Sequence, residues 1–346
     1  MKITIADIAE KAGVSKATVS RVLNNKPEGV GIKTRVRIQE ILDETGFQPS
    51  GFARSLVSGK SRSVGLIIPD IANPFFPLLV RGVEDRLNQA GYSLFLCNSD
   101  RDILKEKNYA NILIEKGVDG VILDSTESDC SCHLELFEKK NIPFVLLNRL
   151  IDGSNKQPGV FVDNRQGAQL AAAHLLSRPG CSLLFINGPA ELSLSKLRQA
   201  GVEDISRAQG LPPESIQILN GDYTIESGYS LTMQRLENAQ AGNSSPFTAI
   251  FAGNDLMAIG ALRALKQAGI SVPDQVEVIG FDDIELARLV EPPLSTIFQP
   301  AREMGARSAE LLLQLIAGKK PRPKTVTMQT HLVLRGTTRT TTEVNI

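Results

Sequence analysis

Tryptophan is absent from this chain of 346 residues, and histidine and cysteine occur only three and four times. Four cysteines are too few for a disulfide scaffold in a chain of this length, which indicates a reducing compartment. No apolar run approaches the roughly 18 residues that a membrane-spanning helix needs. Asp7 interrupts the N-terminal segment before the apolar region of a secretory signal could form. We therefore expect a cytoplasmic protein that is neither secreted nor membrane-bound.

The sequence also lacks the usual marks of an enzyme. Three histidines limit acid–base and nucleophilic triads, and neither a phosphate-cradling glycine loop nor a Gly-x-Ser-x-Gly elbow occurs. The segment Cys130-Ser-Cys132-His133 lacks the two-residue spacer and the second ligand pair of zinc sites. The adjacent carboxylates Asp282 and Asp283 would point to opposite faces of a strand. We predict no catalytic activity, no metal and no cofactor.

What the sequence does contain is an uneven distribution of charge. The whole chain is neutral, with 38 basic and 38 acidic residues, yet residues 1–62 hold eleven Lys/Arg against six Asp/Glu. The remainder of the chain carries the compensating net charge of −5. A small basic head on a larger acidic body favours polyanion binding through the head, and the alternative is an ordinary solvated basic face.

The N-terminal residues carry the capping and spacing signals of a helix-turn-helix. Thr4 and Asp7 form a capping box, and apolar residues then recur at helical spacing up to Gly13, which ends the first helix. Ser15 caps a second helix over 16–24. Two short helices joined by a glycine turn are typical of this motif, whose second helix enters the major groove of DNA.

The exposed face of the second helix suits DNA recognition. Lys16 and Arg21 can donate to guanine or to phosphates, and Ala17 offers a methyl-sized contact for thymine. A third helix is expected over 33–45, so the alternative is a three-helix bundle with no DNA function. The candidate DNA-contacting residues are Thr4, Ser15, Lys16, Ala17, Thr18, Ser20, Arg21 and Asn24.

From Ser63 onwards, short apolar runs alternate with helical patterns. The expected strands are 64–68, 92–97, 121–123, 144–147, 183–186, 216–219, 248–251 and 276–280, and the expected helices are 80–90, 103–116, 134–140, 193–208, 225–238 and 255–268. This alternation predicts two doubly wound parallel sheets. Ligands of such folds lie beyond the carboxyl ends of the strands, so two facing lobes would form a ligand cleft.

The stretch from Thr4 to Asn25 closely resembles the N-terminal headpiece of the lactose repressor/galactose repressor family, as do residues 33–35 and 46–49. Gly31 departs from the family, which usually has Ser there. The resemblance implies a headpiece over 1–48, followed by a hinge linker.

The hinge linker, 49–62, has by itself the composition of a flexible segment. The resemblance implies that the part containing Ala53 folds into a helix only on operator DNA. Leu56 would then wedge open the central base step from the minor groove.

The body resembles the same family, and through it the periplasmic sugar-binding proteins. The matching motifs are Asn73-Pro-Phe-Phe76, Asp119-Gly120, Val162-Asp-Asn164, Asn187-Gly-Pro189, Gly221-Asp-Tyr-Thr224, Gly253-Asn-Asp255, Gly280-Phe-Asp-Asp283 and 292–297. The resemblance implies an all-α headpiece and a two-lobed α/β body over 63–340, like a periplasmic binding protein. The expected lobes are 63–160 with 292–320, and 161–291 with 321–340.

By position, the resemblance also implies an effector cleft that suits a sugar. Phe75 and Tyr223 would be the aromatic platforms and Arg198 a bidentate donor. The candidate effector-binding residues are Phe75, Asp124, Asn148, Arg149, Lys196, Arg198, Tyr223, Asn254 and Asp282. The cations Arg149 and Lys196 exceed what a neutral sugar needs and point to a sugar acid. A purine-type corepressor is the alternative effector.

The predicted function is that of a ligand-responsive repressor of carbohydrate catabolism genes. It would bind palindromic operator DNA as a homodimer, because one recognition helix reads only a few base pairs. The alternative is a sugar-binding module without a DNA function, which the basic helix-turn-helix argues against. The C-terminal tail has no leucine heptad, so no tail-built tetramer is predicted.

Overall fold

The computed structural model describes residues 3–23, 28–47, 60–125, 131–149, 157–178, 180–238 and 246–339. The chain divides into two compact units, Met1–Arg62 and Ser63–Ile346. No described helix is long and apolar enough to cross a membrane.

The smaller unit is a three-helix headpiece. Its helices are α1 (Ile5–Lys11), α2 (Lys16–Leu23) and α3 (Ile32–Thr45). The predicted capping box is confirmed, because the Thr4 amide donates to Asp7 Oδ2 at 2.8 Å and the Asp7 amide donates to Thr4 Oγ1 at 3.4 Å. Gly13 adopts a left-handed φ of 60° in the turn, where a side chain would be strained. The buried side chains are Ile8, Ala9, Ala12, Val19, Val22, Ile38 and Leu42.

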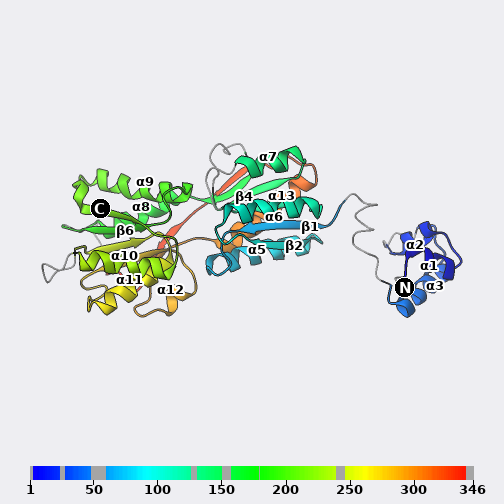
Figure 1. Cartoon of the computed structure of the whole chain (residues 1–346), viewed down its shortest axis with the longest axis horizontal. Coiled ribbons are helices and arrows are strands. Elements are labelled where there is room, and N and C mark those ends of the chain that lie inside the picture. Colours follow the sequence, from blue (N-terminus) through cyan, green and yellow to red (C-terminus); the bar gives the residue numbers. More distant parts are fainter. Residues whose placement is uncertain are drawn as a thin grey trace. The chain divides into compact units, whose positions relative to one another are not determined.

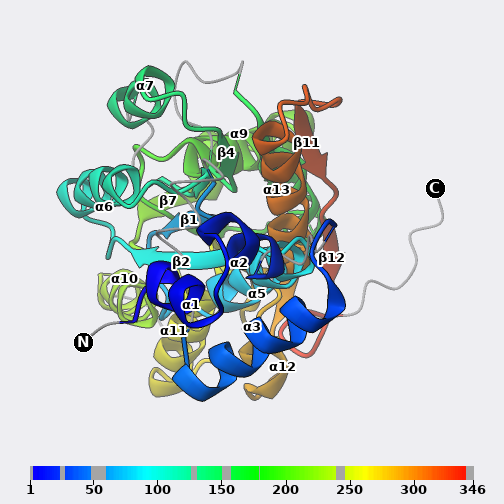
Figure 2. The same cartoon turned by 90° about the vertical axis from the view of Figure 1, so that its right-hand side faces the viewer.

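The larger unit contains two six-stranded sheets. The first sheet has the order β11-β5-β4-β3-β1-β2, and its neighbours all pair in parallel. Its strands are β1 (Ser63–Ile68), β2 (Ser93–Asn98), β3 (Gly120–Leu123), β4 (Phe144–Leu147), β5 (Gly159–Val162) and β11 (Thr325–Met328). Its helices are α5 (Phe75–Gln89), α6 (Ile103–Glu115), α7 (Ser131–Lys139) and α13 (Ala301–Ile316). We call this sheet and its helices lobe one. Figure 2 shows α6 and α7 on one face of the sheet, and α5 and α13 on the other.

Lobe two is built on the second sheet, of order β12-β10-β9-β8-β6-β7, in which only β12 runs antiparallel to its neighbour. Its strands are β6 (Leu183–Asn187), β7 (Ile216–Asn220), β8 (Ala249–Ala252), β9 (Glu277–Asp282), β10 (Ser295–Phe298) and β12 (His331–Val333). Its helices are α8 (Asn164–Leu175), α9 (Ser193–Ala208), α10 (Ile225–Glu237), α11 (Asp255–Gln267) and the short α12 (Leu286–Leu289), with a single 3-10 turn at Pro213–Ser215. In Figure 1, α8 and α9 lie above β6, and α10 and α11 lie below it. The predicted architecture of two doubly wound parallel lobes is therefore confirmed.

The division of the chain between the lobes differs from the expectation. We expected 292–320 in lobe one, and α13 does lie there, but β10 pairs with β9 and belongs to lobe two. We expected 321–340 in lobe two, but β11 pairs with β5 and belongs to lobe one. The second crossing therefore follows Phe298, the last residue of β10, instead of residue 291. The third crossing lies between β11 and β12.

Candidate functional site

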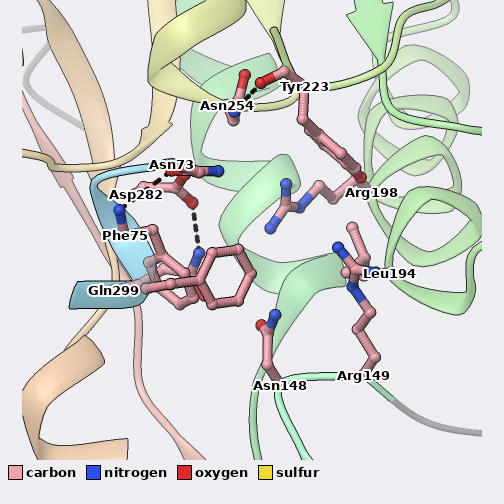
Figure 3. Close-up of a pocket in the computed structure, with 11 residues that line it drawn as sticks. Asn73, Phe75, Asn148, Arg149, Leu194, Arg198, Tyr223, Asn254, Asp282 and Gln299 are labelled. Carbon is pink, nitrogen blue, oxygen red and sulfur yellow. Dashed lines mark hydrogen bonds between the residues drawn. The ribbon is translucent and has the colours of Figure 1, made fainter. Parts of the chain in front are cut away.

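A cavity of about 30 Å³ lies between the two lobes (Figure 3). It is lined by Asn73, Phe75, Phe76, Asn148 and Arg149 of lobe one, by Leu194, Arg198, Tyr223, Asn254 and Asp282 of lobe two, and by Gln299 of the second crossing. Most of these residues follow the carboxyl end of a parallel strand. The cavity therefore occupies the place where doubly wound sheets bind ligands.

Aromatic rings form two walls of the cavity. Phe75 and Phe76 begin α5 and pack edge to face, with ring centroids 5.3 Å apart. Tyr223 lies across the cavity in Figure 3, and its hydroxyl is 2.9 Å from Ser195 Oγ. A Cβ at Gly188 would come within 1.9 Å of the Tyr223 hydroxyl, so only glycine there leaves room for the ring. This close approach explains the glycine of the Asn187-Gly-Pro189 motif.

Arg198 is a buried cation that projects from α9 into the cavity (Figure 3). Its Nε donates to Asn164 Oδ1 at 2.9 Å, and a terminal nitrogen donates to the carbonyl of Gly253. The guanidinium also lies 3.7 Å from the centroid of the Phe281 ring. Burial lowers the pKa of Arg198, while the Tyr223 and Asp282 side chains oppose that shift. The fixed, stacked guanidinium can present its remaining donors to oxygen atoms of a ligand.

Asp282 is the carboxylate of lobe two at the cavity. Gln299 Nε2 donates to its Oδ1 at 2.6 Å, and burial raises its pKa to about 7 against the opposing pull of Arg198. Asp255 lies behind it and accepts from the Thr296 hydroxyl at 2.5 Å and from the Ile284 amide at 2.9 Å. Burial, together with the charge of Asp282, raises the pKa of Asp255 well above its usual range. Asp282 is therefore only partly ionised near neutral pH.

A second cation, Arg149, approaches the cavity from lobe one. Its Nη1 donates to the Ser125 carbonyl at 3.1 Å, and its Nε is 3.3 Å from Asp124 Oδ1. Asp124 does not line the cavity, but its Oδ2 accepts from Asn148 Nδ2 at 2.9 Å. Burial raises the pKa of Asp124 to about 6, and the charge of Arg149 limits that shift. Asp124 thus positions two cavity residues without being one itself.

Three of the cavity residues have backbone conformations that are uncommon for residues with a side chain. Asn148, Tyr223 and Asp282 have φ values of 63°, 68° and 122°, which side-chain-bearing residues rarely adopt. Such conformations persist only where surrounding contacts enforce them, and they cluster at ligand sites.

The structure brings together seven of the nine effector-binding candidates and leaves two outside the cavity lining. Asp124 lies behind it, and Lys196 is exposed on α9. Lys196 precedes Arg198 by two residues, which places their side chains about 200° apart around the helix. Contrary to the expectation, Lys196 does not line the cavity, and the helical spacing by itself indicates that it would not lie beside Arg198.

Four lining residues were absent from the candidate set, namely Asn73, Phe76, Leu194 and Gln299. Asn73 and Phe76 belong to the motif Asn73-Pro-Phe-Phe76. Gln299 directly follows β10, a strand that the sequence pattern does not predict. Asn73 Oδ1 caps the Phe75 amide at 3.1 Å, while Oε1 of Gln299 is buried with no hydrogen-bond partner among the described residues. The Gln299 oxygen can accept a hydrogen bond from a ligand.

The headpiece presents a second candidate surface. Ser15, Lys16, Ala17 and Arg21 are exposed at the start and along the outer face of α2, and Thr4 is exposed before α1. Thr18 and Ser20 are half-buried, and the Thr18 amide donates to Ser15 Oγ at 3.2 Å, as expected of a helix cap. Asn24, Ala53 and Leu56 lie outside the described residues, as do Cys130 and the side chains of Cys132 and His133.

Comparisons with known proteins match both units. The model of bacterial regulatory proteins of the lacI family matches residues 4–50, and that of a periplasmic binding protein-like domain matches residues 172–338. The ribose operon repressor of Halalkalibacterium halodurans is 37% identical over 337 residues, covering 97% of both chains.

Two solved structures extend this likeness. The lac repressor dimer bound to operator and the anti-inducer ONPF is 28% identical, with a TM-score of 0.85, covering 98% of this chain and 99% of that one. A LacI family transcriptional regulator from Enterococcus faecalis V583 with bound ribose is 31% identical, with a TM-score of 0.69. It covers 80% of this chain and 98% of its own.

Proposed function

This chain belongs to the lacI family of bacterial regulatory proteins and is a DNA-binding transcriptional regulator; from that premise we propose that it represses carbohydrate genes in response to a small neutral sugar. The observation that carries the choice of effector is the balance of charge around the cavity. Each buried cation there is under the electrostatic influence of one carboxyl group, Arg149 of Asp124 and Arg198 of Asp282, so a ligand need not bring a full negative charge.

The balance rests on two pairs. Arg149 lies beside Asp124, with 3.3 Å between Nε and Oδ1, and Arg198 and Asp282 shift each other's pKa as opposite charges do. Lys196, which had favoured a sugar acid, is exposed and contributes no charge to the lining. Burying an anionic ligand beside Asp282 would add a repulsion that a neutral sugar avoids.

The chemistry of the lining narrows the effector further. Aromatic faces pack against sugar C–H groups, while Asn73, Asn254 and the free Gln299 oxygen offer hydrogen bonds to hydroxyls. Since a relative is a ribose operon repressor and a similar structure holds ribose, we propose a pentose such as D-ribose.

The DNA-binding half of the function uses α2. We propose that Lys16 and Ala17, at its N-terminal end, read base edges, and that Arg21 anchors the helix to guanine or phosphate. Two headpieces in a homodimer would bind a palindromic operator in the cytoplasm, with Leu56 of each hinge in the minor groove. The effector alters DNA affinity only if it binds one arrangement of the lobes better than another.

Isothermal calorimetry on the full chain tests the effector class with D-ribose, D-gluconate and adenine as probes. We expect saturable binding of D-ribose and no binding of D-gluconate or adenine. Addition of D-ribose should change affinity for an operator selected from random DNA by about 5- to 150-fold. Selected sites should be palindromic.

Two variants make the test specific to the cavity. Lys196→Ala should bind D-ribose like the parent protein because that side chain is exposed, whereas Arg149→Ala should bind it weakly. Binding of D-gluconate in place of D-ribose would show that the charge argument is wrong. Binding of adenine alone would favour the purine alternative.

A further inference from the structure

Three short segments connect the two lobes: those between β5 and α8, between β10 and α13, and between β11 and β12. Lobes joined in this way can rotate about their connections, as in other two-lobed binding proteins. A contact between the lobes outside these three connections therefore stabilises the lobe arrangement in which that contact forms.

Arg101 makes such a contact. It follows β2 of lobe one, and its Nη2 donates to Asp70 Oδ2, beyond β1, at 2.8 Å. Its Nη1 donates to the backbone carbonyl of Asp222, which follows β7 of lobe two. The side chains of Arg101 and Asp70 are 30% and 26% exposed, so water competes only partly with these bonds. One guanidinium thus bridges the lobes.

The turn that carries Arg101 is held in an uncommon conformation. Asp100 and Arg101 have left-handed φ values of 52° and 61°. The Arg101 amide donates to the Pro69 carbonyl at 3.0 Å, and the Ser99 amide donates to the Ile68 carbonyl at 2.9 Å. These bonds anchor the turn to β1, so the guanidinium is aimed at lobe two by the backbone of lobe one.

The acceptor in lobe two is equally well fixed. Asp222 Oδ1 accepts from the Thr224 amide at 3.0 Å and from its hydroxyl at 2.6 Å, and this turn leads into α10. The Asp222 carbonyl belongs to the peptide unit that it shares with Tyr223, which lines the cavity. Asn254 Nδ2, also at the cavity, donates to the Tyr223 carbonyl at 3.1 Å. Arg101 therefore ends one peptide away from the effector site.

We propose that Arg101 is an interlobe latch: a positioning residue that stabilises the closed arrangement of the lobes around the cavity without touching the effector. Its effect on lobe arrangement is independent of the effector's identity, whereas its effect on sugar affinity rests on the proposed function. Arginine suits the role because its fork reaches Asp70 and the Asp222 carbonyl together, and lysine can satisfy only one of them fully.

The latch is tested on the full chain by electron paramagnetic resonance. Genetically encoded nitroxide labels at the exposed positions Lys139 and Arg207 report the distance between the lobes. Without any sugar, Arg101→Ala should reduce the ratio of closed to open molecules by about 3- to 10-fold, the range expected for one such hydrogen bond. Arg101→Lys should restore part of the closed population.

Lys105→Ala is the matched control, since Lys105 pairs with Asp100 inside lobe one and should leave the distance distribution unchanged. Saturating D-ribose should close every variant, but Arg101→Ala should need about 3- to 10-fold more of it. Thermal unfolding should be nearly equal for all variants, which separates the latch from a general loss of stability.

An unchanged distance distribution in Arg101→Ala would overturn the latch, as would an equal change in Lys105→Ala. If Arg101→Ala opens the lobes while the parent protein does not bind D-ribose, the latch stands and the proposed effector fails. If Arg101→Ala does not fold, Asp70→Asn replaces it, because loss of the ion pair should shift the ratio in the same direction by a smaller factor.

Discussion

The headpiece surface and the interlobe cavity are built in opposite ways. The residues that we assign to base reading lie exposed within the eight residues of α2, whereas the cavity gathers buried side chains from Asn73 to Gln299. Removing an exposed side chain costs only its contact with DNA. Removing a buried one also leaves its protein partners unpaired. Substitutions on the headpiece surface should therefore change DNA binding without changing stability, whereas substitutions in the cavity should change both ligand binding and stability.

The largest effect is expected for Arg198→Ala. This change deprives Asn164 and the Gly253 carbonyl of their donor and leaves Asp282 without its opposite charge. Loss of a hydrogen bond from a charged group typically costs about 1.5–3 kcal/mol, so calorimetry should show D-ribose affinity reduced by at least about 10-fold.

Operator binding by Arg198→Ala distinguishes two modes of regulation. If the effector releases DNA, the variant should bind operator like the parent protein and ignore the effector. If the effector promotes DNA binding, the variant should bind operator weakly under all conditions. Arg165→Ala, which removes an exposed arginine from α8, serves as the control. Unchanged sugar affinity in Arg198→Ala would show that the cavity is not the effector site.

A smaller effect, confined to DNA, is expected for Arg21→Ala. The loss of one contact to guanine or phosphate should weaken operator binding by about 5- to 150-fold, or about 1–3 kcal/mol, while sugar affinity and thermal stability stay unchanged. Fluorescence anisotropy at several salt concentrations measures the loss. Lys11→Ala removes the same charge from α1. Its effect shows how much of the loss of operator affinity comes from the lost charge alone. An equal loss of operator affinity in both variants would contradict the proposed contact of Arg21 with guanine or phosphate.

The smallest effect concerns stability and pH. The pKa of Asp282 is about 7 in the folded chain and 3.8 for the free side chain, so the folded state holds its proton more tightly. The free energy of unfolding should therefore fall as pH rises from about 4 to about 7, and Asp282→Asn should flatten this dependence. At pH 7.5 the variant should be more stable by roughly 0.5–2 kcal/mol and should bind D-ribose poorly, which is the usual trade-off at a binding site.

Urea unfolding at pH 4.5, 6.0 and 7.5 measures this dependence. Asp204→Asn is the control, because its ion pair with Arg165 lowers the pKa of Asp204 to about 2 and keeps it ionised throughout the range. Asp124 and Asp255 also have raised pKa values and should preserve part of the slope. A slope identical to that of the parent protein would mean that Asp282 is ionised throughout.

The headpiece could be predicted closely because its signals are local. A capping box joins residues three apart, and Gly13 and Gly46 each end a helix within the segment that they punctuate. The alternation of strands and helices likewise gave the two parallel sheets. These features depend on residues that are close together in the sequence, so one sequence is enough to predict them.

The second and third lobe crossings and part of the cavity could not be predicted, because they depend on which distant strands pair. Strand β10 reads Ser-Thr-Ile-Phe, and both of its polar residues are buried. They form hydrogen bonds with Asp255, Thr337 and Thr338, residues about 40 positions away in the sequence. Without that strand, neither the second crossing nor Gln299 could be placed. Asp124 is a similar case: its position after the strand 121–123, together with the family resemblance, predicts a ligand contact, and only the fold shows that it contacts Arg149 instead.

The position of Asp124 behind the cavity has an evolutionary consequence. Because Asp124 does not line the cavity, its replacement by Asn would keep the lining residues and remove the negative charge beside Arg149. Under the proposed function, this one mutation would favour acidic sugars over neutral ones. Effector preference would then change without any change in the residues that line the cavity.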